Sequence, residues 1–186
     1  MKRLIRSRGL LAAGIVAAAA AWPLAQAAHA APVEPAVPPG IAVSEGNKLF
    51  LVGHAVGVQI YMCSATAGEY RWSFLGPRAE LYGDNGKLLT THFAGPAWQA
   101  VDGSTAVGSL VRGVTVDPTA IPWLLLSATG TGGHDGDRLA GTTFIQRTAT
   151  TGGLMPSAER CGATTAGTTS EVPYTADYHF WKTTGS

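Results

Sequence analysis

The sequence contains little charge and only two cysteines. Of its 186 residues, 13 are Lys or Arg and 12 are Asp or Glu, which gives a formal net charge of +1. A chain that is 46% hydrophobic and 13% charged is not typical of intrinsic disorder. So small a net charge excludes a nucleic-acid-binding protein that depends on an excess of basic residues, and we expect no nucleic-acid partner.

Long hydrophobic runs are also scarce. Residues 10–21 form an Ala-rich apolar run after four basic residues, but the run is short for a span of roughly 20 residues and Trp22-Pro23 ends it. Ala28-His29-Ala30, with Ala25-Gln26-Ala27 as a second candidate, has the small residues that signal peptidase recognises. We therefore predict a cleaved signal peptide over residues 1–30, a periplasmic or extracellular location, and no transmembrane segment in the mature chain.

Cleavage would also change the charge of the protein. The four basic residues before residue 10 would be lost with no acidic ones, leaving 9 basic and 12 acidic residues and a net charge of about −3. Such a chain is poorly suited to binding phosphates or anionic lipids.

The two cysteines, Cys63 and Cys161, both lie in the predicted mature chain. In an oxidising compartment two cysteines are expected to pair, so we predict a disulfide. A catalytic thiol and a metal ligand are the alternatives. A nucleophilic thiol exported with one other cysteine would be prone to oxidation, which favours the structural disulfide.

The predicted mature chain has the frequent turn residues that are typical of an all-β protein. Residues 31–40 hold four prolines and predict an extended lead-in. Residues 41–186 alternate short apolar runs with Gly, Pro, Asn and Asp, and have no clear helical periodicity. We predict one antiparallel domain, either a sandwich or a closed barrel, of about eight to ten short strands.

Alternation within the predicted strands assigns side chains to faces, because successive residues of a strand point to opposite sides. Strands are expected at residues 48–52 and 56–63, the second with an apolar face of Val56, Val58, Ile60 and Met62. A strand around residues 107–116 is expected to turn Leu110, Val114 and Val116 inward. Near the C-terminus the apolar face consists of Tyr174, Ala176, Tyr178 and Phe180.

Two sets of residues could carry chemistry. Four histidines, His54, His92, His134 and His179, could form a metal site, although none are spaced to place two ligands on one face. His92 with Asp102 or Ser104 could form a hydrolase site, although no Gly-x-Ser-x-Gly motif surrounds the serine. We expect no cofactor, and keep the metal-binding protein and the hydrolase as alternatives.

The favoured prediction is a non-enzymatic binding or interaction module of the cell envelope. Trp98 lies beside a predicted turn and has the best claim among the aromatic residues to an exposed ring. His92, Trp98, Asp102 and Ser104 are close in sequence and are the candidate ligand-binding residues, with Trp98 stacking on the ligand and the others making polar contacts. The ligand would be a glycan, a small molecule or a protein.

Several short motifs together resemble a known family. They occur in this order: Gln59-Ile60-Tyr61-Met62-Cys63, His92-Phe93-Ala94-Gly95-Pro96-Ala97-Trp98, Asp102-Gly103-Ser104, Ile121-Pro122-Trp123-Leu124-Leu125-Leu126, Ile145-Gln146-Arg147, Thr151-Gly152-Gly153, Cys161 and Val172-Pro173-Tyr174-Thr175-Ala176-Asp177-Tyr178. The chain is similar, over about residues 38–181, to the exported bacterial and fungal proteins catalogued as domain of unknown function 3455. The resemblance implies a secreted β-rich domain with a pair of cysteines, and it implies no catalytic residues.

Overall fold

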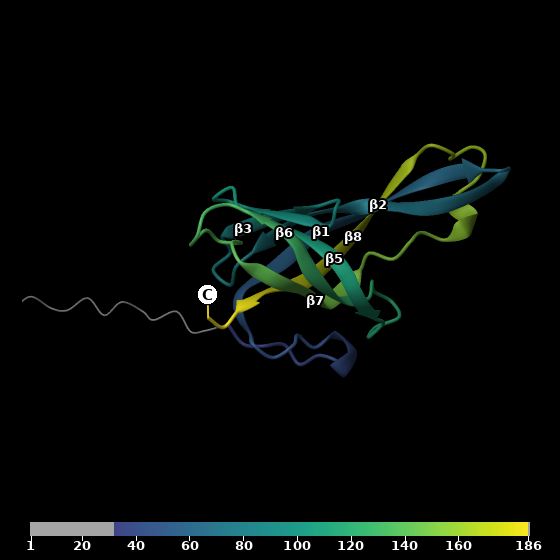
Figure 1. The fold of residues 1–186 in the computed structure, drawn as a ribbon. Helices are drawn as coiled ribbons and strands as arrows, with labels where there is room; N and C mark the ends of the chain where they lie inside the picture. Colours follow the sequence, from purple (N-terminus) through teal and green to yellow (C-terminus); the bar gives the residue numbers. More distant parts are fainter. Residues whose placement is uncertain (1–31, 186) are drawn as a thin grey trace, which may run out of the picture. The chain divides into compact units, whose positions relative to one another are not determined.

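The chain folds into a closed barrel of eight antiparallel strands. A computed structural model describes residues 32–185, so the predicted signal peptide lies outside the described residues. The strands are β1 (Asn47–Thr66), β2 (Glu69–Tyr82), β3 (Leu88–Phe93), β4 (Ala97–Ala100), β5 (Thr105–Val114), β6 (Trp123–Gly132), β7 (Thr142–Gly152) and β8 (Thr169–Thr183), and Figure 1 labels all of them except β4. The prediction of an all-β fold is confirmed, and the barrel is the architecture present.

Each strand pairs with its neighbours in sequence, and β1 closes the barrel by pairing with β8 as well as β2. The two strands predicted at 48–52 and 56–63 are one strand of 20 residues, β1. The far end of β1, the start of β2 and the start of β8 run together beyond the other strands, forming an extension (Figure 1). A turn at Asp84-Asn85-Gly86 joins β2 to β3.

The main core lies in the barrel interior. The predicted C-terminal face is confirmed, because Tyr174, Ala176, Tyr178 and Phe180 are all buried in this core. The inward face of β1 is instead formed by Ala55, Gln59, Tyr61 and other residues of the same parity. Val56 therefore lies on the outer face and is 60% exposed. The face of β1 that turns into the core is the one opposite to the predicted apolar face of Val56, Val58, Ile60 and Met62.

Close backbone packing helps to fix this choice of face. A Cβ atom at Gly57 would lie 2.2 Å from the Arg78 carbonyl oxygen and 2.5 Å from the Cα atom of Ala79. Glycine at this position lets β1 and β2 approach closely inside the barrel. The expectation for Leu110 and Val116 is also wrong, since they are 60% and 48% exposed and β5 ends at Val114.

Residues before β1 cover part of the outer surface. The short 3₁₀ turn η1 (Pro39–Ile41) buries Ile41 and contacts β5 and β6. Gln146 donates a hydrogen bond to the Ile41 carbonyl at 2.7 Å and accepts one from the Trp181 indole at 2.9 Å. The predicted extended lead-in, residues 31–40, thus leads into a segment that packs on the barrel.

A second, smaller core lies in the extension. It contains Tyr61, Cys63, Trp72 and Cys161, with Val172 packed against them. The predicted disulfide is present between Cys63 and Cys161. It ties β1 to the segment between β7 and β8 that contains the 3₁₀ turn η2 (Ala158–Arg160). Across residues 32–185, no helix is both long enough and apolar enough to cross a membrane.

Candidate functional site

A cavity inside the barrel is the candidate site. Its volume is about 270 Å³, and every strand except β5, together with the β3–β4 turn, contributes to its wall. The lining residues are Gln59, Phe74, Leu75, Gly76, Pro77, His92, Gly95, Pro96, Trp98, Leu124, Leu126, Arg147 and Tyr178. Because most of these side chains are apolar while a few are polar, the composition is that of a small-molecule pocket.

Three stacked and tilted rings form one side of the cavity. His92 and Trp98 are direct register partners on β3 and β4, and their rings stack with centroids 4.3 Å apart and an interplanar angle of 5°. Tyr178, on β8, meets both rings edge-on at 5.0 and 5.5 Å. The rings fix one another, so the cavity wall is rigid at this point.

The His92 ring is held in one neutral form. Its Nδ1 lies 2.9 Å from the Ala97 carbonyl oxygen, which can only accept, so Nδ1 carries the proton and donates. Burial lowers the pKa of His92 to about 3, despite the opposing effect of that hydrogen bond. At neutral pH the Nε2 atom is therefore an unprotonated hydrogen-bond acceptor.

Two other lining residues have polar atoms without partners. Trp98 is fully buried, so the expectation of an exposed ring is wrong, and its indole Nε1 has no hydrogen-bond partner among the described residues. The Gln59 side chain is 2% exposed, and its Nε2 is unpartnered as well. Buried donors without an acceptor are costly and unusual, so these two atoms are candidate contacts for a bound molecule.

Arg147 brings a positive charge to the inner face of the barrel. It lies on β7 between its register partners Leu124 and Tyr178, both of which also line the cavity. Its Nε and Nη2 donate to the Pro122 carbonyl oxygen at 3.1 and 2.8 Å. In the part of the chain that the structure describes, Arg147 forms no ion pair with a carboxylate.

Asp102 and Ser104 are not part of this cavity. The Ser104 hydroxyl donates to Asp102 Oδ1 at 2.6 Å and accepts from the Leu139 backbone N–H at 3.1 Å. Asp102 also accepts from the backbone N–H groups of Ser104 and Arg138. These bonds lower the pKa of Asp102 to about 2, and the bond from the Ser104 hydroxyl has the largest effect. The pair therefore fastens the β4–β5 turn to the loop before β7.

The four residues predicted as one site thus divide into two pairs. His92 and Trp98 line the barrel cavity, whereas Asp102 borders a separate hollow with Arg138 and Lys182. Within residues 32–185 no hydrogen bond joins His92 to Asp102 or Ser104. The arrangement does not assemble the acid, base and nucleophile that the hydrolase alternative needs.

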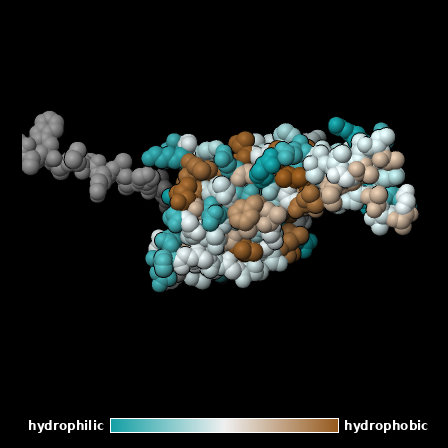
Figure 2. Space-filling view, turned by 90° about the horizontal axis from the view of Figure 1, so that it is seen from above, coloured by the Kyte–Doolittle hydropathy of each residue, from teal (hydrophilic) through white to brown (hydrophobic). Residues whose placement is uncertain are grey.

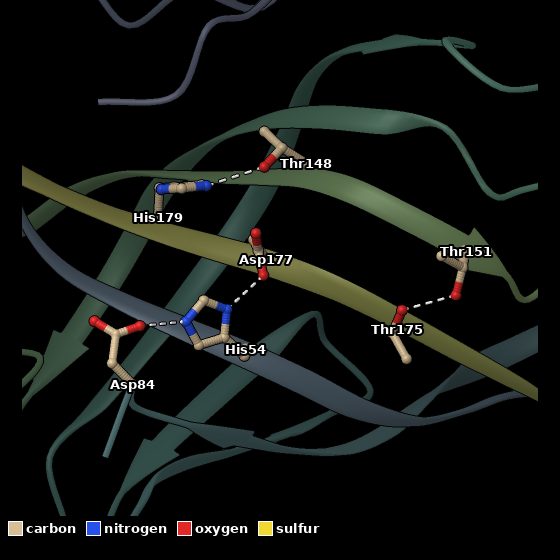
Figure 3. Close-up of polar contacts among 7 residues, drawn as sticks. All are labelled: His54, Asp84, Thr148, Thr151, Thr175, Asp177 and His179. Carbon is tan, nitrogen blue, oxygen red and sulfur yellow. Dashed lines mark hydrogen bonds and ion pairs between the residues drawn. The ribbon is translucent and has the colours of Figure 1, made fainter. Parts of the chain in front are cut away.

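The histidines considered as metal ligands also lie apart. Figure 3 shows His54 between Asp177 and Asp84, with Nδ1 and Nε2 at 2.6 and 2.9 Å from their carboxylate oxygens. These two hydrogen bonds raise the pKa of His54, and the bond to Asp177 has the larger effect. His179 bonds Thr148 at 2.9 Å instead, and burial lowers the pKa of His179.

His134 lies in the loop before β7, where its backbone N–H donates to Asp137. Within the described range 32–185, no three His, Cys, Asp or Glu side chains lie close enough together to hold a metal ion. The four histidines are therefore dispersed over the outer face, the cavity and a loop.

With this geometry established, comparison with known proteins places the chain in a family. A family model described as "Protein of unknown function (DUF3455)" matches residues 44–182. The chain belongs to this family. The matched range includes all eight strands except the last residue of β8, and hence every residue that lines the cavity. Neither the curated proteins nor the solved structures include a match to the chain.

Two polar residues of the cavity, Gln59 and Arg147, were not predicted as site residues from the sequence. Both had a detectable signal, because each is a polar residue on the same strand face as a large apolar one: Gln59 with Tyr61, and Arg147 with Ile145. Gln59 was overlooked since the opposite face of β1 is more apolar. Such a residue predicts either a paired core polar group or a binding site.

Proposed function

We propose that this protein is an exported, non-enzymatic binding protein whose barrel holds one small ligand. Eight-stranded barrels have an interior that side chains can just fill, or that can accommodate a single small molecule. Here the interior is incompletely filled, leaving a cavity of about 270 Å³ between the ring wall and Arg147. A planar, mainly apolar molecule of one or two rings fits this volume and lining.

The observation that carries the proposal is the set of unpartnered donors in the cavity wall. Gln59 Nε2 and Trp98 Nε1 are buried without acceptors, although more than nine in ten buried polar groups are paired in folded proteins. Both belong to residues that line the cavity. A bound ligand with oxygen acceptors would satisfy donors that the folded chain leaves unpaired.

Access to the cavity is consistent with exchange of a ligand. Phe74 and Leu75, on β2 at the base of the extension, line the cavity and are 52% and 46% exposed. In the face shown in Figure 2, apolar residues form several separate groups among paler and polar ones. Exposed apolar residues at the edge of a pocket favour an apolar ligand entering from solvent.

Export is part of the proposal. The signal-peptide pattern over residues 1–30 supports it, and a disulfide is typical of oxidising compartments outside the cytosol. Hydrolysis by His92 with Asp102 or Ser104 is less favoured, because the Ser104 hydroxyl is already bonded to Asp102 and the Leu139 N–H. The binding role is therefore the function that the geometry supports best.

The test is the binding of a two-ring probe to the purified protein, measured by isothermal titration calorimetry. We expect 2-naphthoate, its uncharged isostere 2-naphthamide, or both to bind with one molecule per chain. Leu124→Trp places a large side chain in the cavity wall and is expected to abolish this binding. Leu110→Trp adds the same side chain to an exposed position on β5 and is the matched control.

Binding that survives Leu124→Trp unchanged would place the probe elsewhere and overturn the proposal. Failure of both probes to bind the unaltered protein would overturn it as well. Ser104→Ala is a further control, because Ser104 supports the β4–β5 turn and lies outside the cavity. This variant should lower stability and leave probe affinity unchanged.

A further inference from the structure

We propose that the ligand of the barrel cavity carries a carboxylate, or a similar planar anion, which Arg147 receives. This inference rests on the proposed binding function and specifies the chemical class of the ligand. The cavity combines one cation, several hydrogen-bond donors and an apolar wall, so each part of the ligand is indicated by a different part of the lining.

The charge of the lining is the first step. The guanidinium of Arg147 stays protonated in proteins, while His92 is neutral because burial lowers its pKa to about 3. No Asp or Glu is among the residues that line the cavity, all of which lie in the described range. The cavity therefore carries a net positive charge, which an anionic ligand would neutralise.

The partners of Arg147 are the second step. Two of its five N–H donors are directed at the Pro122 carbonyl oxygen, and its register partner on β8 is the neutral Tyr178. These neutral partners do not compensate a partly buried positive charge as a carboxylate would. A guanidinium binds a planar carboxylate with geometric specificity, since two parallel N–H···O bonds can form.

The other donors are the third step. Gln59 Nε2 and Trp98 Nε1 are unpartnered donors, and a carboxylate supplies two oxygens with lone pairs for them and for Arg147. The unprotonated Nε2 of His92 is an acceptor in the same wall, so a hydroxyl group on the ligand would complement it. Leu124, Leu126 and the rings beside them would contact the apolar body.

The isosteric probes 2-naphthoate and 2-naphthamide test the charge directly, because they differ in the head group and share the ring system. In calorimetry with the unaltered protein, 2-naphthoate should bind at least about tenfold more tightly than 2-naphthamide. Arg147→Met should reduce the affinity for 2-naphthoate by about tenfold or more and change that for 2-naphthamide by less than about threefold.

Two further variants complete the experiment. Arg147→Lys keeps the charge but not the planar fork, so it should retain a preference for 2-naphthoate smaller than that of the unaltered protein. Arg71→Met removes an exposed arginine that pairs with Glu69 in the extension, and it should leave both affinities unchanged. Binding of 2-naphthamide by Arg147→Met reports whether the cavity is still folded.

The outcomes separate this inference from the proposed function. Equal affinity of the unaltered protein for the two probes, with both blocked by Leu124→Trp, would leave the binding function standing and overturn the anionic ligand. An unchanged preference for 2-naphthoate in Arg147→Met would also overturn the role of Arg147. Should Arg147→Met fail to fold, the probe preferences of the unaltered protein and of Arg147→Lys still decide the question.

Discussion

At the scale of single residues, the environment of a side chain decides its chemistry more than its type does. His54 and His92 have the same imidazole, yet their pKa values shift in opposite directions. Hydrogen bonds to two carboxylates raise the pKa of His54 on the outer face, while burial lowers that of His92 inside the barrel. The sequence showed both histidines, but not which surroundings each would have.

The buried His92 predicts a loss of stability in acid. Its pKa in the folded state, about 3, lies below the ordinary value of 6.5, so below pH 6.5 the unfolded chain binds a proton that the folded protein does not. The stability is present above pH 6.5 and is lost as the pH falls towards the folded pKa. Between pH 7 and pH 5 this amounts to about 2 kcal/mol.

Urea unfolding of the protein and of His92→Phe at pH 7 and pH 5 would measure this effect. The free energy of unfolding of the unaltered protein should fall by about 2 kcal/mol more than that of the variant. The contributions of His54 and His179 are common to both proteins and cancel in the comparison. Equal falls in the two proteins would show that folding does not lower the pKa of His92.

At the scale of elements, β1 has apolar residues on both faces, so alternation alone does not assign the inner one. Val56 and Val58 share a face with Ile60, but Gly57 lies against Ala79 and directs the other face into the barrel. A glycine between valines is the local sign of this close approach. The sequence of β1 alone does not show which strand approaches this glycine, so it does not assign the inward face.

Gly57→Ala should therefore destabilise the barrel by about 1–3 kcal/mol, because the added methyl group meets the backbone of Arg78 and Ala79. Gly130→Ala is the matched control on β6, where a Cβ atom would have nothing within 4 Å. Its effect should be within about 0.5 kcal/mol. Thermal unfolding of both variants checks the pair, and equal midpoints would contradict the close packing at Gly57.

At the scale of the whole molecule, one covalent link joins parts of the chain that are far apart in sequence. Cys63 and Cys161 are separated by 98 residues, and the loop they close contains β2 to β7. The link holds the extension to the segment before β8, next to a small core of its own. Closing so long a loop restricts the unfolded chain strongly.

Replacing both cysteines, Cys63→Ser with Cys161→Ser, should lower the free energy of unfolding by about 4–5 kcal/mol in the chain-entropy model. Urea unfolding of the double variant measures the loss, with the unaltered protein in reductant as the control. The two should unfold at similar urea concentrations. A double variant as stable as the oxidised protein would show that the disulfide adds little to this fold.

The sequence by itself determined the all-β class, the disulfide and the inward face of the last strand, because each follows from a local pattern or from the presence of only two cysteines. It also provides the prediction of export. Only the tertiary structure decided that the sheet closes into a barrel, which face of β1 turns inward, and that Gln59, His92, Trp98 and Arg147 meet around one cavity. Alternation gives each strand two faces, and only its neighbours determine which of them is buried.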